Sequence, residues 1–143
     1  MGRIVDTQWA GCEPTEMGLG PCYAIGKLLK ENHLRRTDIH YWEINEAFAA
    51  QVLGCLAAFN SKEFCRRELG LDEAVGEIPM EALNIDGGAI ATGHPVGASG
   101  ARLVLHVLQV LKRQQQQRGI ASLCIGGGQG GAMLIENVSG DIR

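Results

Sequence analysis

The segment IASLCIGGGQGGAMLIEN, residues 120–137, decides how the C-terminal part of this chain folds. It contains two apolar runs, IASLCIG and GAMLIEN, separated by GGQG. Each run has the length of a β-strand, and the glycines between them suit a turn. Because so short a link can join only antiparallel neighbours, the segment predicts an antiparallel strand pair.

Upstream of this pair, strand patterns alternate with helix patterns. Strands are predicted over residues 3–10 and 38–44, and helices over residues 21–32, 45–60 and 101–119. The charged segment 61–84 is predicted to be a surface excursion with one or two helical turns. The apolar side of the last helix is predicted to comprise Ala101, Val104, Leu108 and Leu111. This alternation predicts an α/β fold with a mixed β-sheet flanked by helices.

Size and composition limit the classes of protein to which the chain can belong. Its 143 residues, 45% of them hydrophobic, fit one domain over residues 1–143. A net charge of −3 offers no basic surface for a phosphate backbone, so we expect no nucleic acid partner. The longest apolar stretch, Ala47–Phe59, contains Gln51 and is too short to span a bilayer, so we expect no membrane partner.

Cysteine usage indicates a reducing compartment. The five cysteines are an odd number and form no C-x-x-C pair, which favours free thiols over a disulfide framework. We find no signal-peptide pattern and therefore expect a cytoplasmic protein. No metal site is assigned.

His94 lies in the glycine-rich stretch ATGHPVGASGAR, residues 91–102, between an apolar segment and a predicted helix. Loops at this position present side chains and backbone N–H groups to ligands in α/β folds. Gly93, Gly97 and Gly100 permit positive φ and close approach of another surface. An imidazole held there can act as a general base or as a donor to an oxyanion. The alternative is a turn histidine bonded to nearby carbonyls.

A second glycine cluster, LCIGGGQGG, begins at Cys124. The thiol is predicted to lie at the end of a strand, beside the backbone amides of Gly126, Gly127 and Gly128. Such amides can form an oxyanion hole, and a nearby thiol can transfer protons. The alternative is a buried structural cysteine. The same glycines form a G-x-G-x-x-G pattern, but a strand follows where the dinucleotide motif requires a helix.

The third cluster, NEAFAAQ, begins at Asn45, where a predicted strand meets a predicted helix. Asn45 is a good N-cap candidate, and Glu46 suits the positive end of that helix. The three strand-to-loop junctions each carry a polar group of the kind that acyl transfer needs. Together they predict a site for acyl transfer.

The blocks NEAFAAQ, GGAIATGHPVGASGAR and LCIGGGQGGAML resemble the three signature blocks in the C-terminal half of the thiolases, which include acetyl-CoA acetyltransferases and 3-ketoacyl-CoA thiolases. The segment MGLGP, residues 17–21, also resembles that half. The resemblance spans residues 3–136 and implies half of a thiolase-like three-layer fold. A related sterol-carrier type has a histidine in place of the asparagine of NEAF, so Asn45 indicates an ordinary thiolase.

The resemblance implies a role for each site residue. Asn45 would hold a water that, with His94, forms an oxyanion hole for the substrate thioester. His94 would also activate a nucleophilic cysteine, and Cys124 would be the acid or base at the α-carbon. The Gly126 N–H would contribute to a second oxyanion hole. The residues implied to line the acyl and pantetheine end of the pocket are Met17, Ala47 and Phe48.

The resemblance also implies what such a site works with. The substrates would be coenzyme A thioesters, in Claisen condensation or in thiolysis of 3-ketoacyl-CoA, and no covalently bound cofactor is implied. The nucleophilic cysteine of thiolases belongs to an N-terminal half, which nothing in this chain resembles. The cysteines interpreted as structural or incidental are Cys12, Cys22, Cys55 and Cys65.

Three consequences and two alternatives follow. We expect the isolated chain to be inactive, to expose apolar surface, and to form a homo-oligomer or pair with an N-terminal half. One alternative is a non-catalytic thiolase-derived remnant or interaction module that binds a partner subunit or a CoA-like ligand. A second is an anion-binding or nucleotide-binding α/β domain that uses the Gly93 loop. It is the weaker alternative because the loop contains no Lys or Arg before Arg102.

Overall fold

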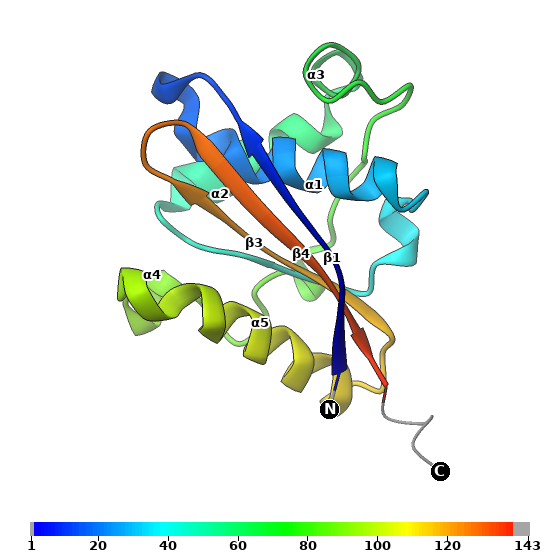
Figure 1. Cartoon of the computed structure of the whole chain (residues 1–143), viewed down its shortest axis with the longest axis vertical. Coiled ribbons are helices and arrows are strands. Elements are labelled where there is room, and N and C mark those ends of the chain that lie inside the picture. The colour runs from blue at the N-terminus through cyan, green and yellow to red at the C-terminus, as the bar shows by residue number, and fades with distance from the viewer. Residues whose placement is uncertain (1, 139–143) are drawn as a thin grey trace.

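A four-stranded mixed sheet forms the centre of the computed structural model, which describes residues 2–138 (Figure 1). The strand order is β1-β4-β3-β2. The strands are β1 (Gly2–Gly11), β2 (Tyr41–Ile44), β3 (Arg118–Ile125) and β4 (Gln129–Asn137). β3 and β4 form the predicted antiparallel hairpin, β1 pairs antiparallel with β4, and β2 pairs parallel with β3. The predicted mixed sheet is confirmed.

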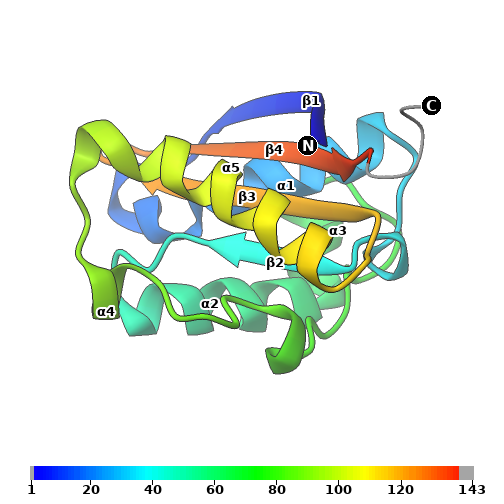
Figure 2. The same cartoon turned by 90° about the horizontal axis from the view of Figure 1, so that it is seen from below.

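Helices cover both faces of this sheet, as Figures 1 and 2 show. One face packs against α1 (Gly20–Glu31) and α2 (Ala49–Asn60), with Ile25, Leu28 and Phe59 fully buried. The other face packs against α5 (Val96–Arg113) through Leu103 and Val107. The short elements are η1 (Pro14–Leu19), η2 (Arg36–Asp38), α3 (Lys62–Glu68), η3 (Met80–Ala82) and α4 (Ala89–Thr92). The predicted three-layer arrangement is confirmed. Among the described residues, none of these helices is both long and apolar enough to cross a membrane.

Helix α5 begins earlier than the sequence pattern predicted. It starts at Val96 rather than at residue 101, so Gly97 and Gly100 are helical. Of the three glycines Gly93, Gly97 and Gly100, only Gly93 has a positive φ. The predicted apolar side was partly wrong, because Ala101 is exposed. The apolar residues of α5 that are buried are Leu103, Val107, Val110 and Leu111.

Helix α2 begins later than predicted, and Asn45 is not its N-cap. The backbone N–H of Asn45 donates to the carbonyl of Ser122 at 2.9 Å, so Asn45 continues the pairing of β2 with β3. The extended residue Phe48 precedes the helix instead. Tertiary hydrogen bonding has therefore overridden the capping preference of an asparagine. The strand before it is also shorter than predicted, because residues 36–38 form a 3-10 turn.

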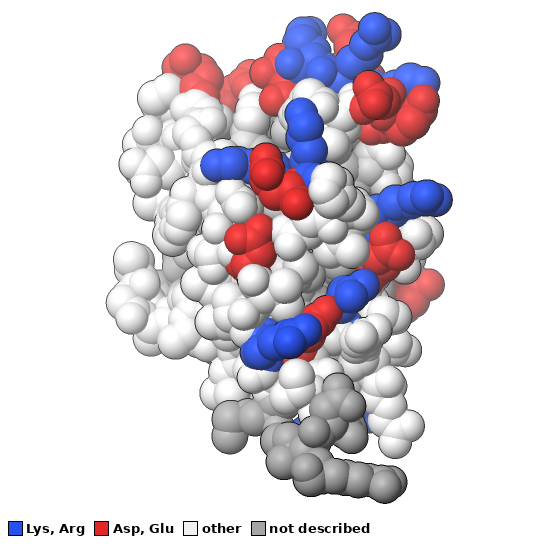
Figure 3. Space-filling model, turned by 45° about the vertical axis from the view of Figure 1, so that its right-hand side comes forward, with Lys and Arg blue, Asp and Glu red and all other residues white. Residues whose placement is uncertain are grey.

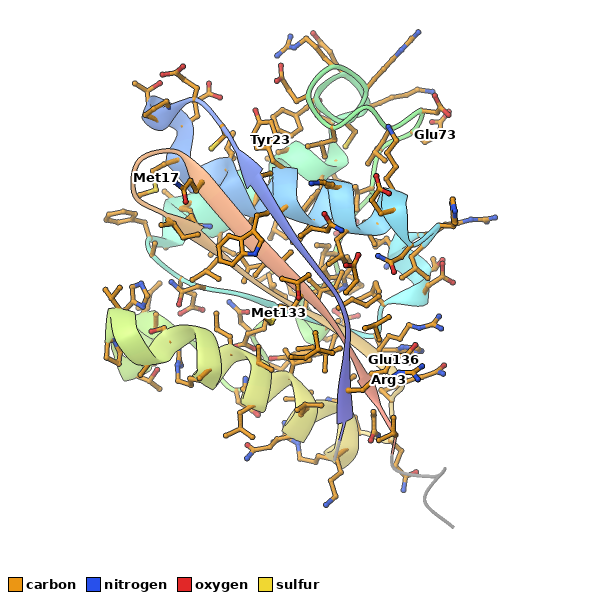
Figure 4. The ribbon with its side chains drawn as sticks, in the orientation of Figure 1. Arg3, Met17, Tyr23, Glu73, Met133 and Glu136 are labelled. Carbon is orange, nitrogen blue, oxygen red and sulfur yellow. The ribbon has the colours of Figure 1, made fainter. Side chains whose placement is uncertain are left out.

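Two glycines bring helix α1 into backbone contact with the sheet. A Cβ at Gly130 would overlap the carbonyl oxygen of Gly20, and one at Gly20 would overlap that of Gln129. Any side chain there would push α1 away from β4. This contact holds the η1–α1 segment, which includes Met17, close to the β3–β4 turn, as Figure 4 shows.

Charged side chains of both signs are interspersed on the face of the molecule shown in Figure 3. On α3, Arg67 pairs with Glu63 and Glu68, and Lys62 pairs with Glu73. These exposed pairs contribute little stability individually. This face presents alternating charges rather than a surface of one sign.

A more buried ion pair joins three strands at the end of the sheet. Glu136 of β4 accepts from Arg118 of β3 at 2.7 Å and from Arg3 of β1 at 2.6 Å. Figure 4 shows Arg3 and Glu136 side by side. The hydrogen bonds from Arg118, and then those from Arg3, lower the pKa of Glu136 below its ordinary value. The ionised carboxylate is therefore the form that the fold favours.

We predict that Glu136→Gln lowers the free energy of unfolding by about 1–3 kcal/mol at pH 7. Because the pKa of Glu136 is depressed in the folded chain, its contribution is present above the unfolded value of about 4.3 and is lost as the pH falls below it. Urea unfolding at pH 7 and at lower pH values measures both effects. The variant should lose part of the acid-induced destabilisation, whereas Glu81→Gln, at an exposed position, should behave like the unmodified chain.

Candidate active site

The parallel strands β2 and β3 place two of the predicted site residues at one edge of the sheet. Ile44 pairs with Ser122, Asn45 follows Ile44, and Cys124 lies two residues beyond Ser122. The carboxyl ends of parallel strands are where α/β folds place their ligand sites. Asn45 and Cys124 therefore both lie at the carboxyl ends of these two strands.

His94 reaches this end from the connection between α4 and α5. The preceding segment forms one helical turn rather than an extended run, and Gly93 ends it with a φ of 87°. Pro95 then starts the chain into α5. His94 is exposed and stands between two helices, not after a strand as the sequence predicted.

The hydrogen bonds of the His94 ring favour one of its two neutral tautomers. Nδ1 lies 2.6 Å from the hydroxyl oxygen of Ser99, and that hydroxyl donates to the carbonyl of Pro95 at 3.2 Å. Because Ser99 uses its only proton on Pro95, it accepts from Nδ1–H of His94. Nε2 then carries a lone pair and not a proton. A neutral imidazole of this tautomer is a base at Nε2.

The Asn45 side chain meets that same nitrogen. Its Nδ2 lies 3.4 Å from Nε2 of His94, so the amide donates toward the lone pair. Asn45 is only 1% exposed, and its Oδ1 is buried without a hydrogen-bond partner among the described residues. The pair therefore offers a base together with an amide whose oxygen is still free to accept.

Two further residues support this pair: Asn84, which the sequence prediction missed, and Glu46, which it assigned to the start of α2. The carboxylate of Glu46 accepts from the Ile90 N–H of α4 at 3.0 Å and from Asn84 Nδ2 at 3.2 Å. Asn84 also accepts from the Ile44 N–H and donates to the Ile44 carbonyl, both at 2.9 Å. Glu46 thus binds the start of α4 and not the start of α2. Glu46 also packs closely against Gly88, where a Cβ would lie 2.6 Å from Glu46 Cδ. The need for a glycine at position 88 becomes clear only once the fold is known.

Cys124 belongs to the same end of the sheet, but no described hydrogen bond joins it to His94 or Asn45. Side chains alternate along β3, so Cys124 shares a face with Ile120, on the side of α1. It is 7% exposed, and burial raises the pKa of its thiol. Cys124 is therefore protonated at neutral pH, which suits a proton donor.

Gly126 begins the turn between β3 and β4. It is exposed, and a Cβ there would meet nothing within 4 Å. Gly127 and Gly128 have positive φ, and a Cβ at Gly128 would overlap the carbonyl of Cys12. Local structure thus explains Gly127 and Gly128 but leaves Gly126 open to another group.

The residues predicted to line the substrate pocket lie near this turn. Phe48 is 64% exposed, and Met17 lies on η1 next to the β3–β4 turn (Figure 4). Gln51 connects the two segments, because it accepts from the Ala47 N–H and donates to Cys55, whose thiol donates to the carbonyl of Gly18. These hydrogen bonds link the segment of Ala47 and Phe48 to the η1 segment that carries Met17.

The remaining cysteines occupy other positions. Cys22, Cys55 and Cys65 are fully buried in the core, and all five cysteines are free thiols. The hydrogen bond with Cys55, and then burial, raise the pKa of the Cys22 thiol. Within residues 2–138, no group of three or more His, Cys, Asp or Glu side chains could hold a metal ion.

Comparison with known proteins assigns this arrangement to one family. The profile of the thiolase C-terminal domain matches residues 1–137. The chain belongs to the thiolase family, as the three sequence blocks predicted.

Curated relatives and solved structures agree. The chain is 44% identical over 141 residues to the peroxisomal 3-ketoacyl-CoA thiolase of Encephalitozoon cuniculi, and 43% identical over 136 residues to the 3-ketoacyl-CoA thiolase of Citrobacter koseri. These matches cover 98% and 95% of this chain but only 32% and 31% of those proteins. Bacillus anthracis acetyl-CoA acetyltransferase superimposes with a TM-score of 0.78 at 40% identity, covering 95% of this chain and 30% of that one. Human mitochondrial 3-ketoacyl-CoA thiolase in complex with CoA superimposes with a TM-score of 0.78 at 39% identity, and the match covers 96% of this chain and 30% of that one. The chain thus spans about a third of the length of the relatives it matches.

We predict that Ser99→Ala changes the balance between the two neutral tautomers of His94. In the unmodified chain, ring 15N shifts of labelled histidine should show His94 protonated at Nδ1 and bare at Nε2. In the variant, the Nε2–H form should appear, because the acceptor that holds Nδ1–H is gone. Ser61→Ala is the matched control, since Ser61 caps α3 through the Phe64 N–H and does not touch His94. A His94 ring that carries its proton on Nε2 in the unmodified chain would contradict the assignment.

Proposed function

We propose that this chain acts as the C-terminal catalytic part of a thiolase that transfers acyl groups between coenzyme A thioesters. The observation that supports this most directly is the Asn45–His94 pair, in which an unprotonated Nε2 and a buried amide face one point. Thioester chemistry needs a base for a thiol and a donor for the oxyanion that follows. The pair supplies both.

The proposed acyl-transfer step uses a cysteine thiol from the rest of a thiolase. His94 Nε2 takes the proton from that thiol, and the thiolate attacks the thioester carbonyl carbon. The carbonyl oxygen becomes an oxyanion, which accepts from the newly formed Nε2–H of His94 and from a water held by Asn45. As the carbonyl re-forms, the CoA thiolate leaves and regains the proton from His94. A second oxyanion hole at the Gly126 N–H would serve the acyl-enzyme.

Cys124 would act in the second half of the reaction. Its thiol is protonated at rest, so in thiolysis it can give a proton to the α-carbon of the departing acetyl-CoA enolate. In the condensing direction its thiolate would remove that proton. The exposed surface around Phe48 and Met17 would hold the acyl and pantetheine end of the substrate.

The setting in the cell is also a proposal. The relatives' names as 3-ketoacyl-CoA thiolases, and the human structure solved with CoA, favour a role in fatty acid metabolism. The free thiols favour a reducing compartment, and the cytoplasm remains our prediction.

The N-terminal part of α5 supplies a surface on which the rest of a thiolase could pack. An apolar groove of about 240 Å³ lies between α5 and the sheet, lined by Trp9, Gly97 and Gly100 among others. Val96 at its rim is 84% exposed. Each helical glycine costs about 1 kcal/mol relative to alanine, yet a Cβ at Gly97 or Gly100 would meet nothing within 4 Å. Since this chain does not require these glycines, we infer that another protein surface approaches them closely.

A reconstitution experiment tests the function. The chain alone should show no thiolysis of acetoacetyl-CoA, and adding the N-terminal part of a thiolase should restore it. In the mixture, His94→Ala and Asn45→Ala should each lower kcat by about 10²–10³-fold. His40→Gln, at an exposed position at the opposite end of β2 from Asn45, should leave kcat unchanged. Turnover by the chain alone would contradict the proposal. A mixture that assembles without turnover would support the alternative, a non-catalytic thiolase-derived interaction module.

Assembly is tested separately from turnover. Gly97→Leu should fill the groove and weaken binding of the N-terminal part by at least tenfold in calorimetry, while leaving the fold of the chain intact. Lys112→Leu, at an exposed position near the C-terminal end of α5, serves as the control. If light scattering shows that the same face instead forms a homo-oligomer that Gly97→Leu disrupts, the partner is a second copy of the chain.

A further inference from the structure

A cluster of charged side chains joins the three segments that position the Asn45–His94 pair. Glu43 of β2 accepts from the Tyr41 hydroxyl and lies 2.9 Å from Nδ1 of His106. The other ring nitrogen of His106, Nε2, lies 3.0 Å from Asp86 Oδ2. Arg113 donates to both carboxylate oxygens of Asp86, at 2.8 and 2.9 Å. The cluster thus spans β2, the segment before α4, and α5.

The two contacts of the His106 ring favour protons on both of its nitrogens. Both ring nitrogens lie within hydrogen-bond distance of a carboxylate oxygen. A neutral imidazole carries one N–H, so one nitrogen would direct a lone pair at a carboxylate lone pair. Only the doubly protonated ring satisfies both contacts with ionised carboxylates.

Charge balance leads to the same assignment. The Glu43 side chain is 2% exposed, and a cationic partner stabilises a buried carboxylate. With His106 protonated, the two carboxylates of Glu43 and Asp86 face the two cations of His106 and Arg113. The hydrogen bond from His106, and then that from Arg113, lower the pKa of Asp86, which keeps it ionised. Burial and the bond to Glu43 raise the pKa of Tyr41, which therefore remains a donor.

The cluster lies where it can control the Asn45–His94 distance. Glu43 lies on β2, two residues before Asn45, and Asp86 precedes α4, which leads into His94. Ser99, which orients the His94 ring, lies on α5 about two helical turns before His106, on the same side of the helix. A shift of α5 relative to β2 would therefore move His94 relative to Asn45.

We propose that His106, in its doubly protonated form, is a positioning residue that ties α5 to β2 and to Asp86 and so holds His94 against Asn45. Its importance for catalysis rests on the proposed thiolase function, but the contacts themselves belong to the chain alone. Every measurement below is therefore made without turnover, so that failure of this proposal and failure of the proposed function remain distinguishable.

The first measurement uses the unmodified chain. Its four histidine rings can be resolved in a 15N-edited ring spectrum at pH 7. The signals assigned to His106 should show protons on both ring nitrogens. A neutral His106 ring, with a carboxyl proton on Glu43 instead, would overturn the proposal.

The second measurement compares His106→Gln with His106→Arg. The glutamine variant removes the charge, and should lower Tm by roughly 5–10 °C and abolish the nuclear Overhauser contact between the Asn45 side-chain amide and the His94 ring. The arginine variant keeps the charge and donors on two sides, and should recover that contact at least in part. His40→Gln, an exposed histidine that accepts from the Arg118 N–H, should change neither. A glutamine variant that keeps both the Tm and the Asn45–His94 contact of the unmodified chain would refute the positioning role.

Discussion

The parallel pairing of β2 with β3 is the interaction on which the candidate site depends. β2 is only four residues long and is buried along its whole length, so it has no freedom to slide along its neighbour. The hydrogen bond from Asn45 to Ser122 extends this pairing by one residue, which fixes the amide side chain at the edge of the sheet. Had Asn45 capped α2, it would have turned away from the sheet, and His94 would have lost its partner.

Polar side chains add to the apolar packing of α5 in holding the other half of the site in place. His94 is exposed and sits on a short connection between two helices, where apolar burial contributes little. Glu46 and Asn84 fix the start of α4, Ser99 fixes the ring, and the His106 cluster fixes α5. Because Ser99 and Glu43 are buried and Glu46 and Asn84 are partly buried, a displaced helix would leave unpaired donors and charges away from solvent. Directional contacts of this kind define a position more sharply than apolar contacts do.

The glycines fall into two classes that differ in what requires them. Gly20, Gly128 and Gly130 have backbone atoms packed against the position of a Cβ, so this chain's own fold requires them. Gly97, Gly100 and Gly126 face open space. The second class lies beside the candidate site and the apolar groove, where a substrate or the rest of a thiolase would approach.

The sequence by itself determined the α/β class, the β3–β4 hairpin and the thiolase family. It also singled out Asn45, His94 and Cys124, of which a described hydrogen bond joins only Asn45 and His94. It could do so because strand periodicity, turn glycines and contiguous motifs are local properties of the chain. The start of α5, the true partner of Glu46, and the roles of Asn84, Ser99 and His106 were decided only by the tertiary structure. Those features depend on contacts between residues far apart in the chain, such as Glu46 with Ile90 and His106 with Glu43. A local sequence pattern does not indicate such contacts. Hydrogen bonds between segments far apart in the chain outweighed the local preference of Asn45 for a helix cap, because burial makes an unpaired backbone group more costly than a lost cap.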